Sequence, residues 1–168
     1  MKGIHTLGLI ALSISFCIAH AESLNVALDQ VTETGQGKHV GMVELEDTRY
    51  GLLITPHIRG LKPGLHGFHV HESHSCAHFG EAAGEHYDPK HTGHHLGPYN
   101  SGGHLGDLPA LYVNPQGQAE LSILAPRVTV KELKGHALMI HAGGDNYGDD
   151  PINGGAGKRI ACGRVGDS

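Results

Sequence analysis

The sequence predicts an all-β fold, an antiparallel sandwich or barrel made of short strands. Apolar and polar residues alternate in several segments, as they do in half-buried strands. The 26 glycines and 8 prolines separate these segments with turns. No segment carries a long 3.6-residue periodicity. A chain of 168 residues without an internal repeat suits one domain with a real core.

Eight segments are predicted as strands because they alternate or are short, apolar and bounded by turn residues. They are residues 23–29, 39–45, 50–58, 65–71, 108–113, 119–125, 136–141 and 159–165. Residues 34–37, Thr-Gly-Gln-Gly, are predicted as the turn between the first two strands. Residues 128–133 can form at most a single helical turn.

Two segments, residues 72–107 and 142–158, are too long and too rich in glycine to be strands. Long ordered loops in a small domain usually carry function. We therefore expect the functional residues of this chain to lie on these two loops and on the strands beside them.

Residues 1–21 have the pattern of a cleaved secretory signal peptide. Lys2 supplies the positive start, residues 7–18 form an apolar run too short to span a bilayer, and Ala19-His20-Ala21 is a small-x-small cleavage site. No later segment is apolar enough to cross a membrane. The predicted mature domain is residues 22–168, and export predicts a periplasmic protein.

The two cysteines of the mature chain, Cys76 and Cys162, favour one disulfide, because exported proteins fold in an oxidising compartment. Two thiolate metal ligands are the alternative, which the absence of a Cys-x-x-Cys motif disfavours.

Removal of the signal peptide, which carries Lys2 and no acid, leaves 11 basic and 17 acidic side chains, a formal charge of −6. This balance disfavours nucleic acids and anionic membranes as partners.

Histidines dominate the chemistry of the sequence, with 16 in the chain. Residues two apart in a strand share a face, so His69 and His71 point the same way and form half of a metal site. Phe68 and Val70 then point toward the core. If the strand is continuous, His66 lies on the opposite face and is interpreted as a hydrogen-bonded structural residue.

Further candidate ligands follow on the first loop and on a later strand. His86, His95 and His104 are spaced nine residues apart, and Asp107 follows His104 by three. His141 ends the apolar segment ALMIH. A carboxylate with imidazoles suits zinc, and a site made only of imidazoles also suits copper. The sequence therefore predicts a dinuclear metal site in a β domain.

The other histidines are interpreted as solvated or as part of a loose metal-scavenging tract. They are His39, His57, His74, His78, His91, His94 and His136. Of these, His74, His78, His91 and His94 could instead bind an additional ion.

Four motifs, GFHVH, GEHYDP…GPYNSGGHLGDLP, ALMIHAGGDN and GKRIACG, resemble those of the copper, zinc superoxide dismutases, in particular the bacterial exported form. The resemblance runs from about residue 24 to residue 165. It implies a Greek-key, eight-stranded antiparallel barrel with two long functional loops, and it allows a homodimer.

The resemblance also implies the site residues. The implied copper ligands are His69, His71, His86 and His141, and the implied zinc ligands are His86, His95, His104 and Asp107, so that His86 bridges the metals. Asp145 would accept hydrogen bonds from His71 and His95. Arg159 would lie beside the copper, and a Cys76–Cys162 disulfide would pin the first loop to the last strand.

An enzyme of this family dismutates superoxide to oxygen and hydrogen peroxide by copper redox cycling, with Arg159 and His86 as the catalytic side chains. Export would make this chain a protector of the cell envelope. Candidates for a patch that attracts the anion are Lys90, Lys131, Lys134 and Lys158. Two other classes stay open: a protein that buffers or delivers copper or zinc, and a structural module whose loops are stiffened by metals.

Overall fold

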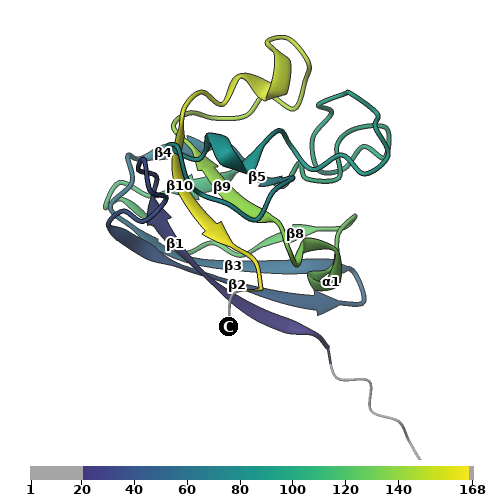
Figure 1. Ribbon diagram of the computed structural model, residues 1–168. Helices are drawn as coiled ribbons and strands as arrows, with labels where there is room; N and C mark the ends of the chain where they lie inside the picture. Colours follow the sequence, from purple (N-terminus) through teal and green to yellow (C-terminus); the bar gives the residue numbers. More distant parts are fainter. Residues whose placement is uncertain (1–20, 167–168) are drawn as a thin grey trace, which may run out of the picture.

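A computed structural model describes residues 21–166 of the chain (Figure 1). The predicted signal peptide lies outside the described residues, apart from Ala21. Within residues 21–166, no helix has the length and apolar character needed to cross a membrane. The described chain is almost entirely strand and loop, which confirms the predicted all-β class.

Ten strands form in the described part of the chain. They are β1 (Ser23–Gln30), β2 (His39–Thr48), β3 (Gly51–Arg59), β4 (Gly64–His66), β5 (Phe68–His71), β6 (Leu111–Val113), β7 (Gln118–Ala119), β8 (Ile123–Ala125), β9 (Ala137–His141) and β10 (Arg159–Arg164). The helical elements are η1 (Glu81–Ala83), α1 (Val130–Leu133) and η2 (Ile152–Gly155). Each of the eight predicted strands is present, and two of them are divided, residues 65–71 into β4 and β5 and residues 119–125 into β7 and β8.

The strands form one curled antiparallel sheet in the order β5-β9-β10-β1-β2-β3-β7, with β8 also paired to β3. A separate two-stranded sheet joins β4 to β6. Alternate side chains of β3 face inward, among them Leu52, Ile54 and Ile58, and all three are fully buried. The two long loops lie at the same end of this curled sheet, beyond β5 and β9 (Figure 1).

The chain changes sheet at Gly67, so the strand that the parity argument assumed to be continuous is broken. A Cβ at Gly67 would lie 2.4 Å from the Cβ of Ala156, a distance too short for any other residue to fit without a shift. The predicted role of His66 is nevertheless confirmed. Its Nδ1 lies 2.6 Å from the carbonyl oxygen of His141 and its Nε2 lies 2.8 Å from that of Lys62.

Strand β5 is buried on both faces, which is what makes it a platform for a site. Phe68 and Val70 point into the core, while His69 and His71 are covered by the loops and are also fully buried. Strand β9 is likewise buried along its whole length, up to His141.

The predicted single helical turn is α1, and its start is fixed by a capping box. The Thr129 hydroxyl accepts the backbone N–H of Glu132, and the Glu132 carboxylate accepts the N–H of Thr129. The N–H of Val130 donates to Asp47 Oδ1 of β2 at 2.9 Å. These contacts fasten the segment between β8 and α1 to the barrel.

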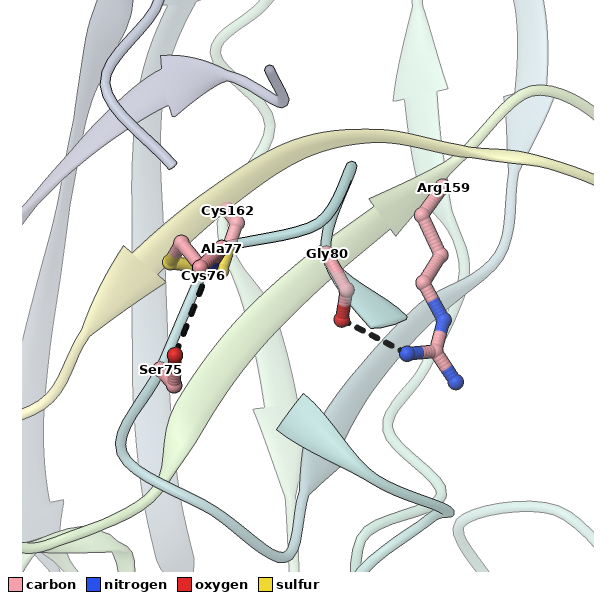
Figure 2. The surroundings of a disulfide bond; sticks show 6 residues. All are labelled: Ser75, Cys76, Ala77, Gly80, Arg159 and Cys162. Carbon is pink, nitrogen blue, oxygen red and sulfur yellow. Dashed lines mark hydrogen bonds between the residues drawn. A yellow bond between two sulfur atoms is a disulfide. The ribbon is translucent and has the colours of Figure 1, made fainter. Parts of the chain in front are cut away.

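Cys76 and Cys162 form a disulfide, with their Cα atoms 5.8 Å apart (Figure 2). The bond links the first long loop to β10, 86 residues further along the chain. The alternative of two thiolate ligands is therefore wrong, and the predicted disulfide is confirmed.

Candidate metal centre

The outer edge of β5 places loop residues against the strand histidines. The N–H of Val70 donates to Gly106, the N–H of Tyr87 donates to Val70, and the N–H of Gly106 donates to Tyr87, each at 2.8 Å. These bonds set His86 opposite His71 and Asp107 opposite His69. A Cβ on Gly106 would lie 2.3 Å from the carbonyl oxygen of Val70, so the close approach requires glycine.

The first cluster consists of buried histidines whose ring nitrogens lie within 4.8 Å of one another: His69, His71, His86 and His141. Backbone carbonyls hold the outer nitrogens of two of them. His71 Nδ1 lies 2.9 Å from Gly84 O, and His141 Nδ1 lies 3.0 Å from Gly157 O.

The inner nitrogens of this cluster, His69 Nδ1, His71 Nε2 and His141 Nε2, are buried and make no hydrogen bond in the structure. A buried polar atom without a partner is costly, so three of them converging on one point indicate that they bind a ligand. Neutral imidazoles around such a point fit copper.

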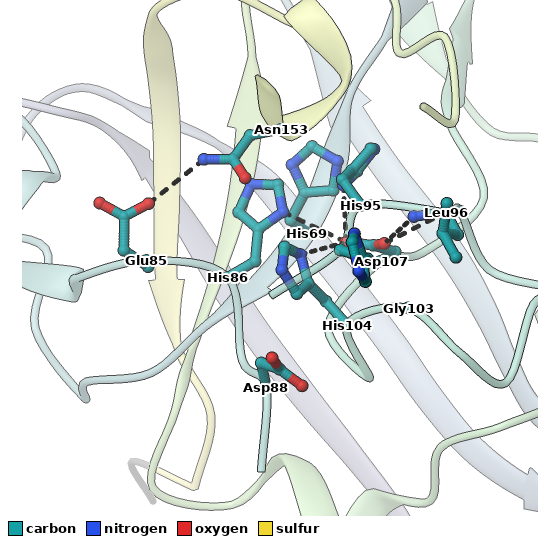
Figure 3. A network of polar contacts seen from close by, with 12 residues as sticks. His69, Glu85, His86, Asp88, His95, Leu96, Gly103, His104, Asp107 and Asn153 are labelled. Atoms are coloured by element: carbon teal, nitrogen blue, oxygen red, sulfur yellow. Dashed lines mark hydrogen bonds and ion pairs between the residues drawn. The ribbon is translucent and has the colours of Figure 1, made fainter. Parts of the chain in front are cut away.

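The second cluster consists of His86, His95, His104 and Asp107 (Figure 3). The Nδ1 atoms of the three histidines lie 3.2, 2.9 and 3.4 Å from Asp107 Oδ1. A tetrahedral zinc ion with bonds of about 2.0–2.1 Å separates its ligand atoms by about 3.3 Å. The donor atoms and their spacing therefore fit a tetrahedral zinc site.

His86 belongs to both clusters. Its Nδ1 faces Asp107, so the opposite ring nitrogen, Nε2, is the atom that it can offer to the first cluster. The His86 ring centroid lies 4.0 Å from that of His69 in the first cluster and 5.2 Å from that of His95 in the second. One imidazole is thus placed to bridge two ions.

Asp145 contacts one histidine of each cluster. In the first cluster its partner is His69, whereas the resemblance implied His71. Asp145 Oδ2 lies 2.5 Å from His69 Nε2 and Asp145 Oδ1 lies 2.9 Å from His95 Nε2. The expected bond to His71 is wrong, because Gly84 occupies the outer nitrogen of His71. His69 is the strand histidine whose ring lies beside that of His95, with the ring centroids 5.4 Å apart.

Burial sets the protonation of the first cluster. It lowers the pKa of His69 to about 3, that of His71 to about 2 and that of His141 to about 4, from an ordinary 6.5. Neutral imidazoles with free lone pairs are the form that binds metal. The cluster is therefore held ready for a cation at neutral pH.

Two carboxylates, Asp107 in the second cluster and Asp145 beside it, dominate the electrostatics around His95. Burial opposes the charge of Asp107 and Asp145, but hydrogen bonds from histidines outweigh it and hold both pKa values far below the usual range. Burial also disfavours the charged form of His95, but hydrogen bonds to both carboxylates raise its pKa to about 9. The negative charge that a zinc ion would neutralise is thus already in place.

A cleft leads to the clusters, and His86 and His141 reach its wall. Arg159 also lines the cleft. Its Nη1 donates to Gly80 O at 2.7 Å (Figure 2), and its Nη2 donates to Gly84 O at 2.7 Å. These two bonds aim the guanidinium from β10 across the loop that the disulfide fixes.

Of the four lysines considered for an attracting patch, Lys158 lines the cleft. Lys131 lies in α1, Lys134 pairs with Glu22, and Lys90 borders a separate small cavity. Of these candidates, the structure thus leaves Lys158 beside the cleft and places the other three elsewhere on the fold.

The sequence interpretation missed several residues around the site. Glu81 and Glu85 line the cleft, and Glu81 Oε2 lies 3.6 Å from Arg159. Asp149 Oδ1 accepts the backbone N–H of His95 at 2.5 Å, and Arg127 binds the loop that carries the second cluster. No spacing signal could have found them, because their partners are distant in sequence or are backbone atoms.

The histidines considered for an additional ion lie outside the clusters of possible metal ligands. Within residues 21–166, the groups of three or more His, Cys, Asp and Glu side chains close enough for a metal do not include His74, His78, His91 or His94. Exposed carboxylates pair with two of them instead, Glu33 with His78 and Asp149 with His94.

The fold and the site define a β-barrel metalloprotein with two histidine-rich clusters that share one ring beside an arginine-lined cleft. The family model described as copper/zinc superoxide dismutase (SODC) matches residues 39–165. The chain belongs to the copper/zinc superoxide dismutase family, an oxidoreductase family, and its cofactors are copper and zinc.

Similar proteins are found in bacteria. "Superoxide dismutase [Cu-Zn] 1" from Salmonella typhimurium (strain 4/74) is 50% identical over 170 residues, covering 95% of this chain and 96% of that protein. The structure of "Cu/Zn superoxide dismutase from Brucella abortus" has a TM-score of 0.81 at 44% identity, covering 86% of this chain and 99% of the other. The solution structure of the monomeric enzyme from Salmonella enterica has a TM-score of 0.76 at 46% identity, with the same two coverages. These neighbours confirm the Greek-key barrel.

Proposed function

We propose that this chain dismutates superoxide with copper in the first cluster and zinc in the second. The observation that carries the proposal is the place of His86, which belongs to both clusters and lines the cleft together with Arg159. A protein that only stores metal needs neither a shared ring nor a cationic side chain at the entrance.

The donor sets support this division of the metals. The first cluster offers only imidazole nitrogens, which suit a redox-active copper ion. The second offers three imidazoles and the Asp107 carboxylate at tetrahedral spacing, which suits a closed zinc site.

The reaction converts two superoxide anions and two protons into one oxygen and one hydrogen peroxide. When bound, copper supplies one-electron transfer in both directions, and zinc supplies positive charge that favours the deprotonated ring of His86. Arg159 attracts the anion and orients it through its planar, permanently charged donors. His86 takes up a proton at Nε2 in one half of the cycle and gives it to the reduced product in the other, and water at the cleft supplies the second proton of the peroxide.

The net negative charge of the mature chain does not oppose this reaction, because the local field in the cleft governs the approach of a small anion; superoxide dismutase is itself a standard example of such steering. Arg159 and Lys158 supply positive charge in the cleft, while Glu81 and Glu85 reduce it. Among these residues, Arg159 is paired with the proposed copper ligand His141 across β10 and β9.

We also propose that the chain is exported to the periplasm and protects the cell envelope. The signal-peptide pattern of residues 1–21 and the Cys76–Cys162 disulfide support this location. Cell fractionation with mass spectrometry of the N-terminus tests this location, and an uncleaved cytoplasmic chain would contradict it.

The homodimer stays a prediction, since the Salmonella enterica relative is described as monomeric. Analytical ultracentrifugation of the mature chain tests it.

The activity is tested on residues 22–168 with the disulfide formed, comparing protein that carries both metals with protein that carries zinc alone. We expect rapid removal of superoxide by the first sample and none by the second. Full loading with both metals and no dismutation would overturn the proposal in favour of a metal-storage or metal-delivery protein.

A further inference from the structure

Arg127 lies outside both metal clusters, yet it binds the backbone of the loop that carries the second one. Its guanidinium donates to four carbonyl oxygens: Pro98 at 2.9 Å, Gly103 at 3.2 Å, Gly97 at 3.2 Å and His104 at 2.5 Å. The loop contains no strand between β5 and β6, so these carbonyls have no sheet partner. Arg127 therefore takes the place of a neighbouring strand for residues 97–104.

Two of these four bonds reach the peptides that hold the metal ligands. His104 offers its ring to the second cluster while Arg127 holds its carbonyl oxygen. The N–H of Gly97 donates to Asp107 Oδ2 at 3.2 Å, and the carbonyl of the same residue accepts from Arg127. The orientation of both ligands is thus coupled to the guanidinium.

The position of Arg127 is itself fixed by the barrel. It follows β8 by two residues and precedes the capping box of α1, whose first turn is tied to Asp47 of β2. The guanidinium is a planar group with five N–H donors, so one side chain can satisfy four carbonyls that a lysine ammonium, with three donors at one point, cannot span.

We propose that Arg127 is a positioning residue that preorganises the second cluster for zinc by fixing the backbone of residues 97–104 to the barrel. This inference rests on the proposed assignment of zinc to that cluster. Partners that orient metal ligands without touching the metal typically change metal affinity about 10- to 100-fold. The effect of Arg127 should fall on zinc, because none of its four carbonyls belongs to a residue of the first cluster.

The test compares the rates at which a chelator removes zinc and copper from the wild type and from the variant Arg127→Lys. This variant keeps the positive charge but loses the planar guanidinium with its five N–H donors. We expect zinc to leave about tenfold faster or more, with copper release unchanged. Arg59→Lys is the matched control, because Arg59 is an exposed arginine that pairs with Glu120 in the structure. Unchanged zinc release, or equal acceleration of zinc and copper release, would overturn the proposal.

A second readout separates positioning from general loosening of the fold. Cobalt(II) in the second cluster reports its geometry in the visible spectrum, and we expect the tetrahedral bands to weaken in Arg127→Lys while they stay intact in Arg59→Lys. If Arg127→Lys does not fold, Thr129→Ala weakens the anchor of Arg127 and should accelerate zinc release in the same direction. Failure of zinc to bind the second cluster of the wild-type protein would instead reject the proposed function. Neither metal release nor the cobalt spectrum depends on dismutation activity.

Discussion

His86 Nδ1 lies 3.2 Å from Asp107 Oδ1, although the two residues belong to different parts of the first long loop. The contact arises because both segments pair with the outer edge of β5. It commits one nitrogen of His86 to the second cluster and leaves the other for the first. The bridging role of His86 therefore follows from how the loop is folded onto one strand.

Replacement of His141 tests the first cluster. His141→Ala removes one of four buried nitrogen donors. Loss of a residue that merely orients a ligand can lower metal affinity by about 100-fold, so we expect loss of a ligand to lower copper affinity by at least that factor. Dismutation should be lost with the copper, while zinc stays bound. Metal analysis beside the activity assay checks this, and full activity in the variant would reject His141 as a ligand.

Replacement of Asp107 tests the second cluster. Asp107→Asn removes the charge toward which three histidine Nδ1 atoms converge, so we expect zinc content to drop sharply. Copper should remain bound, because Asp107 does not belong to the first cluster. Zinc stoichiometry at dialysis equilibrium is the measurement, and an unaltered value would refute the assignment.

Asp145 touches one histidine of each cluster, so its removal should weaken both sites together. We expect Asp145→Asn to lower the affinity for each metal by about 10- to 100-fold, because His69 and His95 lose a charged acceptor. Competition titrations with a chelator measure both affinities. Asp150→Asn, a change in the same loop, is the control, and a loss confined to one metal would contradict the double role.

Arg159 tests the approach of the anion. Arg159→Ala should slow dismutation by about tenfold and flatten its dependence on ionic strength, since charged clefts raise association rates by about ten- to a thousandfold, superoxide dismutase being a standard example. Both metals should stay bound, because Arg159 contacts backbone carbonyls rather than metal ligands. A steep salt dependence that survives in the variant would assign steering to other residues.

The metal-free protein should lose stability as the pH falls from about 6.5 to about 4. The pKa values of His69, His71 and His141 in the folded state, about 3, 2 and 4, lie below the ordinary 6.5, so the unfolded chain binds more protons in this window. Each such histidine can lower stability by up to about 1.4 kcal/mol per pH unit. The pKa of His95 is raised to about 9 in the folded state, so the stability that this residue contributes is constant below pH 6.5 and decreases only as the pH rises above it.

Urea unfolding of the metal-free protein at pH 7, 6 and 5, with the disulfide intact, measures this dependence. A midpoint that does not change across the window would show that these rings are not buried in the neutral form.

Much of the fold could be predicted because its strands alternate strongly, and all eight predicted strands are present. The break at Gly67 could not be predicted, because it depends on Ala156, 89 residues further along the chain, lying against it. Alternation also identified His69 and His71 as neighbours on one face. It carries no information on which of the two contacts Asp145, and the bond to His71 implied by the resemblance is made by His69 instead.

The supporting contacts of the site were the least predictable part. Arg127 binds carbonyl oxygens, and Asp149 binds a backbone N–H, and backbone groups leave no residue pattern in a sequence. Spacing alone led to a dinuclear metal site in a β domain. The donor types favoured zinc and copper, and the roles of Arg159 and His86 came only from the resemblance to a family.

The most direct test of the account is whether His86 joins the two metals. The measurement is the integrated copper(II) electron paramagnetic resonance signal of protein with cobalt(II) in the second cluster, compared with protein that carries zinc there. If the His86 ring bridges the ions, it couples their unpaired electrons, and the copper signal should be quenched with cobalt and full with zinc. A full copper signal in the cobalt protein would contradict a single bridged centre.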